Sequence, residues 1–380
     1  MKTGFFTNLK NEPPVRVVKR EGLPLWKNAI YYFSAIVFAL FLGGVFIAIT
    51  GNNPFLFYAT VFTGSFSNII HIKNLIAMVV PLTITSLGIA YAFKMKFWNI
   101  GAEGQFLMGA FIATAVALAL GDTLPQFITV VIVALSGALG GGLYGVIIAL
   151  LKVRFNTNET LLSLMFNYIA LYIVSYCVYV EFFKKPTQGI PTYEQIPRAA
   201  WLTEFKNGPL PILDTALIIC VLLVVFTFIY FRFTKQGYEI AVVGDSPATA
   251  NYAGMKVKRI IVRTMFISAS IIGLAGALQL MGISSSHTMT PGITGGMGWD
   301  GIIVAWLAKL NPFGILITSF LLSVLEKGCG VARTAYGISE AVAAILQGII
   351  LFSVLAFDFF LRYKLVFRKR QKSVAKEESL

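Results

Sequence analysis

A polar stretch at residues 94–110 interrupts a largely apolar chain and carries side chains suited to binding a polar ligand. Trp98 could stack on a flat ring, and the amides of Asn99 and Gln105 could exchange hydrogen bonds with a ligand. Glu103 could accept hydrogen bonds from hydroxyl groups. A carboxylate at membrane depth costs about 3 kcal/mol on insertion scales, so Glu103 is expected to face a cavity or a partner.

The spacing within this stretch leaves two interpretations open. In helical geometry Asn99 and Glu103 share one face, because they are four residues apart. Trp98 and Gln105 then lie together on another face. A ligand site fits this arrangement, and so does a polar hinge at the membrane surface that binds nothing. Asn167, in a later apolar run, could likewise bond a hydroxyl, a base edge or a neighbouring helix.

The remaining reactive side chains do not form a catalytic or metal-binding pattern. His71 and His287 are isolated, and the three cysteines (Cys177, Cys220 and Cys329) lack paired spacing. The sequence has no GxxxxGK[ST] motif that could hold ATP phosphates. We therefore expect no catalytic residues, no metal site and no cofactor bound by this chain.

Composition predicts a membrane protein. The chain has 380 residues, a mean hydropathy of +0.77 and only 13% charged residues. Several apolar runs exceed the roughly 18 residues that a transmembrane helix needs. The net charge of +14 is carried beside these runs rather than on a soluble domain, so it indicates membrane orientation rather than nucleic-acid binding.

The fold class expected is an all-α polytopic membrane protein with about ten transmembrane helices. We expect an N-terminal arm at 1–28, a transmembrane domain at 29–361 and a basic tail at 362–380. The predicted spans are 29–50, 74–93, 101–120, 126–150, 160–180, 212–231, 264–283, 299–309, 312–327 and 338–361. In the fourth span, Gly137, Gly141 and Gly145 recur every four residues, which predicts close packing against another helix.

Charge sets the expected orientation. With both termini inside, 24 of the 31 Lys and Arg residues lie on the inner side and 7 on the outer side. The span at 299–309 is short for a full crossing at 1.5 Å per residue. A re-entrant hairpin there would put the tail outside; we keep it as a short crossing. The outer loop at 181–211 is interpreted as a solvated connector or as a contact surface for an external partner.

The loop at 232–263 is the longest strongly charged interruption of the apolar pattern, and its basic residues predict a cytoplasmic location. Ser246 and Pro247 provide a helix N-cap and a first-turn proline, and Gly254 can end the helix. The loop is therefore expected to present a short helix that a partner can push.

Four blocks in this order resemble the membrane permeases of ATP-binding-cassette (ABC) importers, in the branch for branched-chain amino acids, simple sugars and nucleosides. The blocks are 97–111, 158–173, 242–278 and 296–321, and the resemblance extends over roughly 30–365. The run Asn-Ile-Gly-Ala-Glu-Gly-Gln at 99–105 is most similar to the purine-nucleoside permeases. Ribose permeases carry an aspartate-containing block there.

The resemblance implies a permease in the plasma (inner) membrane of a bacterium. It would pair with a second, related permease, bind cytoplasmic ATPases that use ATP, and receive a nucleoside from an external binding protein, a lipoprotein by similarity. The segment similar to the ATPase-coupling motif includes Gly244, Asp245, Pro247, Ala248, Ala250 and Gly254. That motif usually begins Glu-Ala-Ala, whereas Ala248-Thr249-Ala250 stands here, so its leading acid is missing.

The residues predicted for the substrate pathway are Trp98 for stacking, Asn99 and Gln105 for hydrogen bonds, Glu103 for a ribose hydroxyl or a structural bond, and Asn167. One alternative keeps the importer and changes the cargo to ribose or another monosaccharide. An alternative from another class is an ion-coupled secondary transporter, which would show internal repeats with interrupted helices. A membrane enzyme is disfavoured by the missing catalytic residues.

Overall fold

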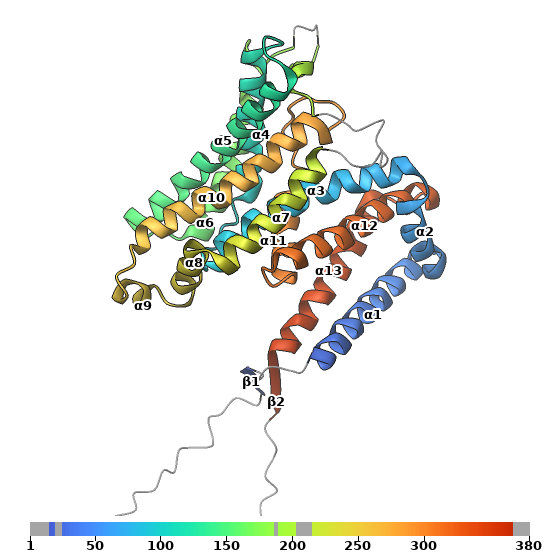
Figure 1. Cartoon of the computed structure of the whole chain (residues 1–380). Coiled ribbons are helices and arrows are strands. Elements are labelled where there is room, and N and C mark those ends of the chain that lie inside the picture. The colour runs from blue at the N-terminus through green and yellow to red at the C-terminus, as the bar shows by residue number, and fades with distance from the viewer. Residues whose placement is uncertain (1–14, 20–24, 186–188, 203–214, 368–380) are drawn as a thin grey trace, which may run out of the picture. The chain divides into compact units, whose positions relative to one another are not determined.

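The computed structural model describes residues 15–19, 25–185, 189–202 and 215–367, and these residues form two compact units. Unit 1 comprises residues up to Ala59 and from Arg333 onward, and unit 2 runs from Thr60 to Ala332. Both units are predominantly helical (Figure 1). The helices that belong wholly to unit 2 are α3 (Ile69–Lys94), α4 (Ala102–Leu120), α5 (Gln126–Phe155), α6 (Glu159–Cys177), η2 (Arg198–Ala200), α7 (Thr215–Phe233), α8 (Lys235–Asp245), α9 (Pro247–Tyr252), α10 (Val257–Leu278), η3 (Gln279–Ile283) and α11 (Met297–Leu307).

Polar side chains in the sequence determine where several of these helices start. Asn68 accepts a hydrogen bond from the backbone N–H of His71 at the start of α3. Asn158 accepts from the first turn of α6, and Ser246 accepts from Thr249 at the start of α9. Each cap satisfies a backbone donor that has no partner within its helix.

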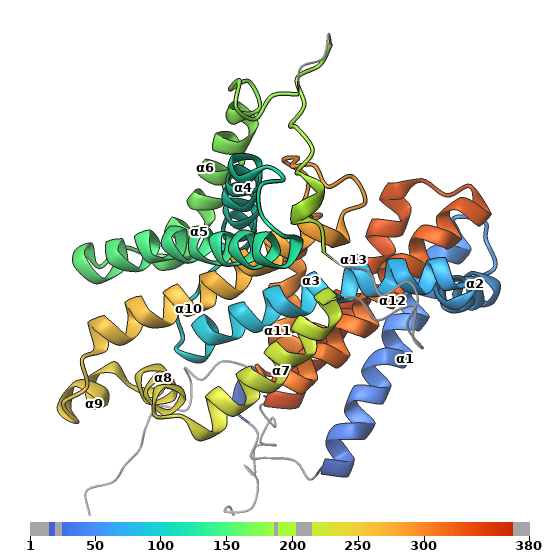
Figure 2. The same ribbon diagram turned by 45° about the horizontal axis from the view of Figure 1, so that its top comes forward.

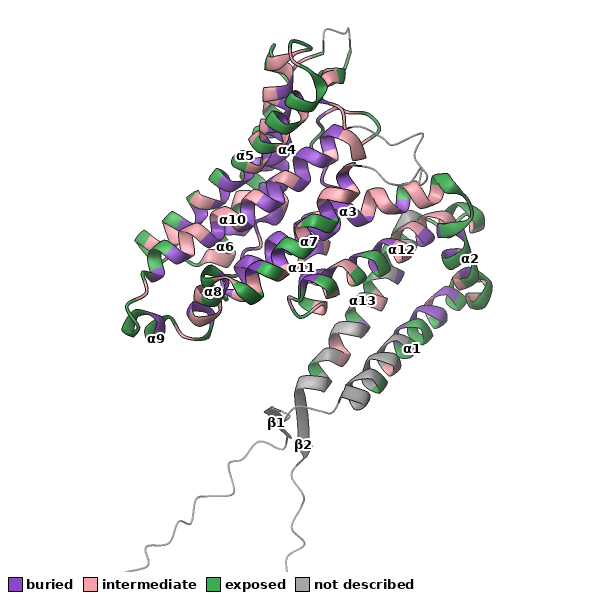
Figure 3. Ribbon diagram, in the orientation of Figure 1, coloured by how far each residue is buried: buried purple, intermediate pink, exposed green. Residues whose placement is uncertain are grey.

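Helices α3 and α10 form the centre of unit 2. The most apolar window of α3 is 83% buried and that of α10 is 61% buried, against 22% for α6 and 28% for α7. Figure 3 shows buried residues following α3 and α10. Helix α10 packs against α3, α4 and α5 (Figure 2). Helices α6 and α7 therefore lie at the periphery of the unit.

Glycines bring α5 and α10 into backbone contact. A Cβ atom added at Gly273 would lie 2.5 Å from the carbonyl oxygen of Gly137 and 2.8 Å from the Cα of Gly141. A Cβ at Gly145 of α5 would collide with the Cβ of Ala269, which also belongs to α10. The close packing predicted for the glycine repeat of the fourth span is thus confirmed, and its partner is α10.

Unit 1 pairs the two ends of the described chain. Helix α1 (Leu25–Ile49) packs against α13 (Glu340–Arg362), and strand β1 (Val15–Lys19) pairs antiparallel with β2 (Tyr363–Phe367). Helices α2 (Pro54–Phe66) and α12 (Pro312–Tyr336) each run from one unit into the other. The N- and C-terminal flanks of the helices consequently lie side by side within unit 1.

A helix occupies each of the ten predicted spans, although the number of crossings stays a prediction. Seven helices of the described residues are long and apolar enough to cross a membrane, or eight if Val37–Ile49 and Pro54–Phe66, bent by 114°, make one span. Helices α2 and α8 were not anticipated from the sequence. The predicted terminal arm and tail fall largely outside the described residues (1–14, 20–24 and 368–380), as do residues 186–188 and 203–211 of the predicted outer loop.

The short span corresponds to α11, which follows a long non-helical segment. In that segment, Met289 and Ile293 are buried in one cluster with Leu107 and Phe111 of α4. Residues 284–296 therefore run along α4 before α11 begins. Bends and turns make up most of this segment, and α11 itself is a helix of only 11 residues.

Replacing Gly273 by alanine is expected to destabilise the protein by about 1–3 kcal/mol, because the new methyl group overlaps the backbone of α5. Gly330→Ala is the matched control, since a Cβ there meets no atom within 4 Å. Thermal unfolding of the detergent-solubilised protein measures both. Equal unfolding midpoints for the two variants would contradict the proposed backbone contact.

Candidate functional site

The connection between α3 and α4 is held by a pair of buried amides. The Asn99 Nδ2 donates to the Gln105 Oε1 over 3.0 Å, and the Gln105 Nε2 donates back to the Asn99 Oδ1 over 3.1 Å. Both side chains are fully buried. Two amides can satisfy each other in this way inside a low-dielectric interior.

The expected helical geometry of residues 98–105 is wrong. Asn99 lies in a non-helical connection, and α4 begins only at Ala102 with Gly101 as its N-cap. The physical reason is local: the Asn99 Oδ1 accepts from the N–H of Gly101, a side-chain bond that competes with helix formation. Asn99 therefore meets Gln105 rather than sharing a helix face with Glu103.

Helix α6 holds this connection from the other side. The Ser163 Oγ accepts from the N–H of Ile100 over 3.0 Å. Asn167 accepts from the N–H of Gly104 over 2.8 Å and donates to the carbonyl of Ile100 over 2.9 Å. Asn167 thus makes the interhelical bonds that were one of its two expected roles. Ser163 had no signal in the sequence, because a serine in an apolar helix most often bonds its own backbone.

Glu103 binds the start of α11. Its Oε2 accepts from the N–H of Gly298 over 2.8 Å, and the Thr294 side chain also bonds the carboxylate. The α11 N-cap, Gly296, has no side chain to offer. A carboxylate at a helix N-terminus satisfies free N–H groups and interacts favourably with the helix dipole. Glu103 therefore serves as a cap supplied from another helix.

Trp98 belongs to a partly exposed aromatic cluster. Its ring stacks on Trp306 of α11 with centroids 5.3 Å apart and planes 11° apart, and Phe93 lies 5.4 Å away. Trp98 and Trp306 are 39% and 37% exposed. Trp306 was not singled out from the sequence, since nothing in the spacing places it beside a residue some 200 positions earlier.

Two further carboxylates lie in the same part of unit 2. Asp300, in the first turn of α11, interacts electrostatically with Glu103, and Glu326 of α12 interacts with Asp300. Neither carboxylate is among the residues predicted for the substrate pathway. Ionisable groups at membrane depth generally face protein or water rather than lipid.

The five predicted pathway residues therefore fall into two groups. Asn99, Gln105 and Asn167 are buried and bonded to protein groups, and the half-buried Glu103 is bonded through its carboxylate. Trp98 keeps part of its ring exposed. A role for any of them in the substrate pathway stays a prediction.

The predicted short helix in the charged loop is present as α9. Ser246 caps it, Pro247 occupies its first turn, and Gly254 follows it with a φ of +76°. Ala250 is fully buried, whereas Pro247 and Ala248 are exposed. One face of α9 is thus packed against the protein, and the other face is exposed.

Helix α8 supports α9 against the rest of unit 2. Gly244 is buried against the backbone of Lys94 and Met95 at the end of α3, where a Cβ would collide with the Lys94 carbonyl. Asp245 ends α8 and is exposed. The segment predicted for ATPase coupling is therefore joined directly to the central helix α3.

The described part of the outer loop forms a packed layer. Tyr193 and Ile196 are buried, and the Tyr193 hydroxyl donates to the carbonyl of Val174. Burial raises the pKa of the Tyr193 phenol, which keeps this donor protonated. Trp201 stacks on His287 with ring centroids 4.0 Å apart. A role as a contact surface for an external partner stays a prediction.

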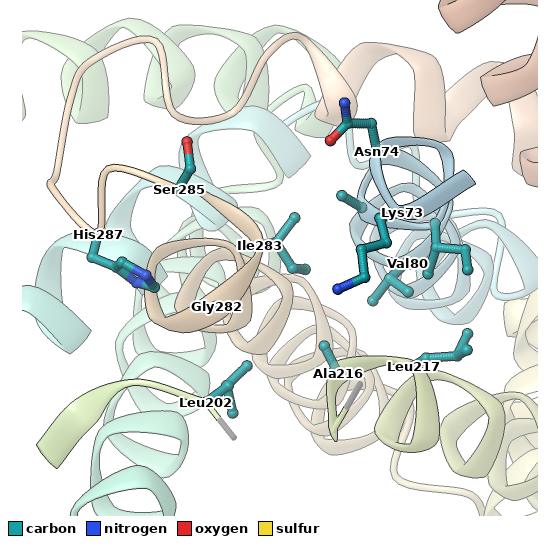
Figure 4. Close-up of a pocket in the computed structure, with 12 residues that line it drawn as sticks. Lys73, Asn74, Val80, Leu202, Ala216, Leu217, Gly282, Ile283, Ser285 and His287 are labelled. Carbon is teal, nitrogen blue, oxygen red and sulfur yellow. The ribbon is translucent and has the colours of Figure 1, made fainter. Parts of the chain in front are cut away.

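A cavity of about 300 Å³ lies next to this layer, between α3, α7 and the end of η3. Figure 4 shows Lys73 extending into it, with Asn74, Ser285 and His287 on its wall. Apolar side chains complete the lining. None of the predicted pathway residues lines this cavity.

The fold is that of a polytopic helical membrane protein, with seven or eight helices of the described residues long and apolar enough to cross a membrane. The family described as "Branched-chain amino acid transport system / permease component" matches residues 71–355. The protein belongs to this family and is a permease subunit of an ABC importer.

Relatives match along most of the chain. The guanosine ABC transporter permease protein NupP of Bacillus subtilis is 29% identical, over 84% of this chain and 90% of its own length. The nucleoside ABC transporter permease protein NupB of Lactococcus lactis is 28% identical, over 84% and 88%. The glucose ABC transporter permease protein TsgB13 of Haloferax volcanii is 24% identical, over 91% and 92%.

Glu103→Ala is expected to increase hydrogen exchange at residues 297–301, because the buried N–H of Gly298 loses its acceptor at a cost of about 1–3 kcal/mol. Glu103→Gln retains a neutral acceptor and should lose less protection. Hydrogen exchange followed by mass spectrometry measures the effect. Glu181→Gln, at an exposed acid, is the control. Unchanged exchange in Glu103→Ala would contradict the capping role.

A double-mutant cycle between Asn99 and Gln105 should give a coupling energy of about 0.5–3 kcal/mol. Each single change to leucine leaves one buried amide unpaired, whereas the double change removes both. Unfolding midpoints in denaturant supply the free energies. The control is a second cycle that combines the Asn99 change with a change of Gln195, which bonds Ser286 in the outer layer and does not contact Asn99. In this control cycle the two losses of unfolding free energy should add. Additive effects for Asn99 and Gln105 would show that the pair carries no coupling.

Proposed function

We propose that this permease subunit takes up nucleosides delivered by an external binding protein. The observation that carries the proposal is the similarity to a guanosine permease and a nucleoside permease along 84% of the chain. The run at 99–105, which resembles the purine-nucleoside branch, is also the segment that the buried amides fix in place.

The proposed topology has ten crossings with both termini inside, in the plasma membrane of a bacterium. The pairing of β1 with β2 supports it, because an even number of crossings returns the chain to the side on which it started. The charge distribution supports the same orientation, with 24 of 31 basic residues inside.

The proposed partners are a cytoplasmic ATPase, a second related permease in a heterodimer, and a binding protein that is a lipoprotein. ATP is used by the ATPase, and this chain binds no cofactor. Helix α9 is the proposed coupling helix: its exposed face is open to a partner, while Ala250 ties it to the core. Basic residues beside α9, Lys256 and Arg259, suit a partner surface with acidic groups.

Within the pathway, Trp98 is the proposed stacking residue, and the neighbouring Trp306 supports this by holding its ring. Asn99, Gln105 and Asn167 are proposed to form the wall of the pathway and to keep Trp98 in position. Glu103 is proposed to act beside the route through its structural bond to α11.

A monosaccharide is the second candidate cargo, favoured by the similarity to a glucose permease over 91% of the chain. An ion-coupled transporter that works alone is disfavoured by membership of an ABC permease family. A nucleoside carries a base and a monosaccharide does not, so a competition experiment with the two kinds of compound distinguishes the two candidate cargoes.

The test is ATP-dependent uptake of labelled guanosine into vesicles that hold this chain with its neighbouring permease, ATPase and binding protein. Unlabelled nucleosides are expected to inhibit uptake, whereas ribose and glucose are not. Trp98→Ala should raise KM about fivefold or more through the loss of one base-stacking contact. If ribose or glucose inhibits uptake and nucleosides do not, the proposed nucleoside cargo is rejected, while the assignment as an ABC importer is retained.

Gly254→Val is expected to uncouple ATP hydrolysis from uptake, because a β-branched residue is strained at a φ of +76° and the end of α9 must shift. ATP hydrolysis and guanosine uptake are measured in the same vesicles. Gly51→Val, at a φ of +85° with no neighbour within 4 Å, controls for strain alone. Full uptake by Gly254→Val would reject α9 as the coupling helix.

A further inference from the structure

Helix α6 presents a row of tyrosines that no structural role in the described residues explains. Tyr168, Tyr172 and Tyr176 of α6 are 49%, 68% and 72% exposed, and Tyr179, just after the end of the helix, is 64% exposed. Tyr168, Tyr172 and Tyr176 recur every four residues, so they lie along one face of the helix. The opposite side of α6 carries Asn167 and faces α4, at the edge of unit 2 (Figure 2). We refer to these four residues as the tyrosine stripe.

The tyrosine stripe extends deeper into the membrane than the residues of an ordinary aromatic belt. Helix α6 has 19 residues, which span about 28 Å. Tyr168 lies about 14 Å and Tyr172 about 20 Å from its start. Tyrosines of an aromatic belt lie at the two membrane–water interfaces, which suits Tyr176 and Tyr179. Tyr168 lies in the middle of the helix, and Tyr172 lies about 8 Å from its end.

The tyrosine hydroxyls need polar surroundings. None of the four donates a hydrogen bond to another described residue of the chain. A hydroxyl in hydrocarbon without a partner is costly, because lipid tails supply no acceptor. The tyrosine stripe therefore faces water, a polar ligand or another protein rather than lipid.

Side-chain size argues against a closely packed helix on this face. Helices that meet in membranes use small residues at their contact, as α5 and α10 do through Gly141 and Gly273. The exposed face of α6 carries Leu161 and Met165 before the tyrosines. Bulky side chains of this kind hold a neighbouring backbone away and leave space between.

We propose that the tyrosine stripe is a stacking wall along which a nucleobase passes during transport. This inference rests on the proposed nucleoside cargo and names the residues that contact it. Aromatic side chains stack on any base without reading its edge, and phenol hydroxyls bond ribose or water. Successive tyrosines stand about 6 Å apart along the axis, a short step from one ring to the next.

Accessibility tests the surroundings of the tyrosine stripe directly. In the assembled transporter with Cys177, Cys220 and Cys329 replaced by alanine, Tyr172→Cys is expected to react with a charged methanethiosulfonate reagent. Phe226→Cys, at a 54% exposed position in the middle of α7, is the matched control and should not react. Guanosine at about four times its Kd should slow labelling of Tyr172→Cys about fivefold, because occupancy lowers the free fraction.

Uptake kinetics test the stacking. Tyr172→Leu is expected to raise KM for guanosine about fivefold or more, at the lower end of the effect of one lost base stack. Tyr172→Phe keeps the ring and should stay within about twofold of the parent, since stacking does not need the hydroxyl. Phe226→Leu should leave KM unchanged.

Two outcomes would overturn the proposal. Failure of the reagent to label Tyr172→Cys in a transporter that takes up guanosine would place the stripe in lipid. Labelling without protection by guanosine, together with an unchanged KM in Tyr172→Leu, would leave it as a solvent or subunit contact. If the parent transporter takes up no nucleoside at all, the proposed function fails instead, and labelling alone still reports whether the stripe meets water.

Discussion

Backbone contact between α5 and α10 is the constraint on which the rest of unit 2 depends. Gly273 lies against Gly137 and Gly141 with no room for a side chain, and Gly109 of α4 lies against Gly273 as well. Three helices thus meet at one glycine. This contact sets the position of α4, and α4 in turn carries Gln105 and Glu103 to their partners on the α3–α4 connection and on α11.

The polar groups of the α3–α4 connection bond other protein groups, as a membrane interior demands. The break between α3 and α4 would leave backbone donors without partners, and Ser163 and Asn167 of α6 accept from two of them. Helix α6 therefore has two different faces: one stabilises an irregular connection, and the other carries unbonded phenol groups. The first face belongs to the packed interior of unit 2, and the second face is exposed.

Local patterns allowed much of the fold to be predicted from the sequence. Apolar runs located a helix in every predicted span, and the cap at Ser246 with Gly254 located α9, because these signals act within a few residues. The glycine repeat predicted a close contact but could not name α10 as its partner. Asn99 was misplaced because its side chain accepts from the N–H of Gly101, which keeps it in the connection before α4 begins. Trp306 and Ser163 were missed because their partners lie far away in the chain.

The bond between Glu103 and Gly298 also bears on how the protein is made. Helix α11 starts with free N–H groups at a glycine cap, and its acceptor belongs to α4, which is synthesised nearly 200 residues earlier. The carboxylate of Glu103 is thus synthesised before α11. The order of the chain lets the late, short helix insert against a waiting acceptor, so that its polar end need not be exposed to lipid during biogenesis.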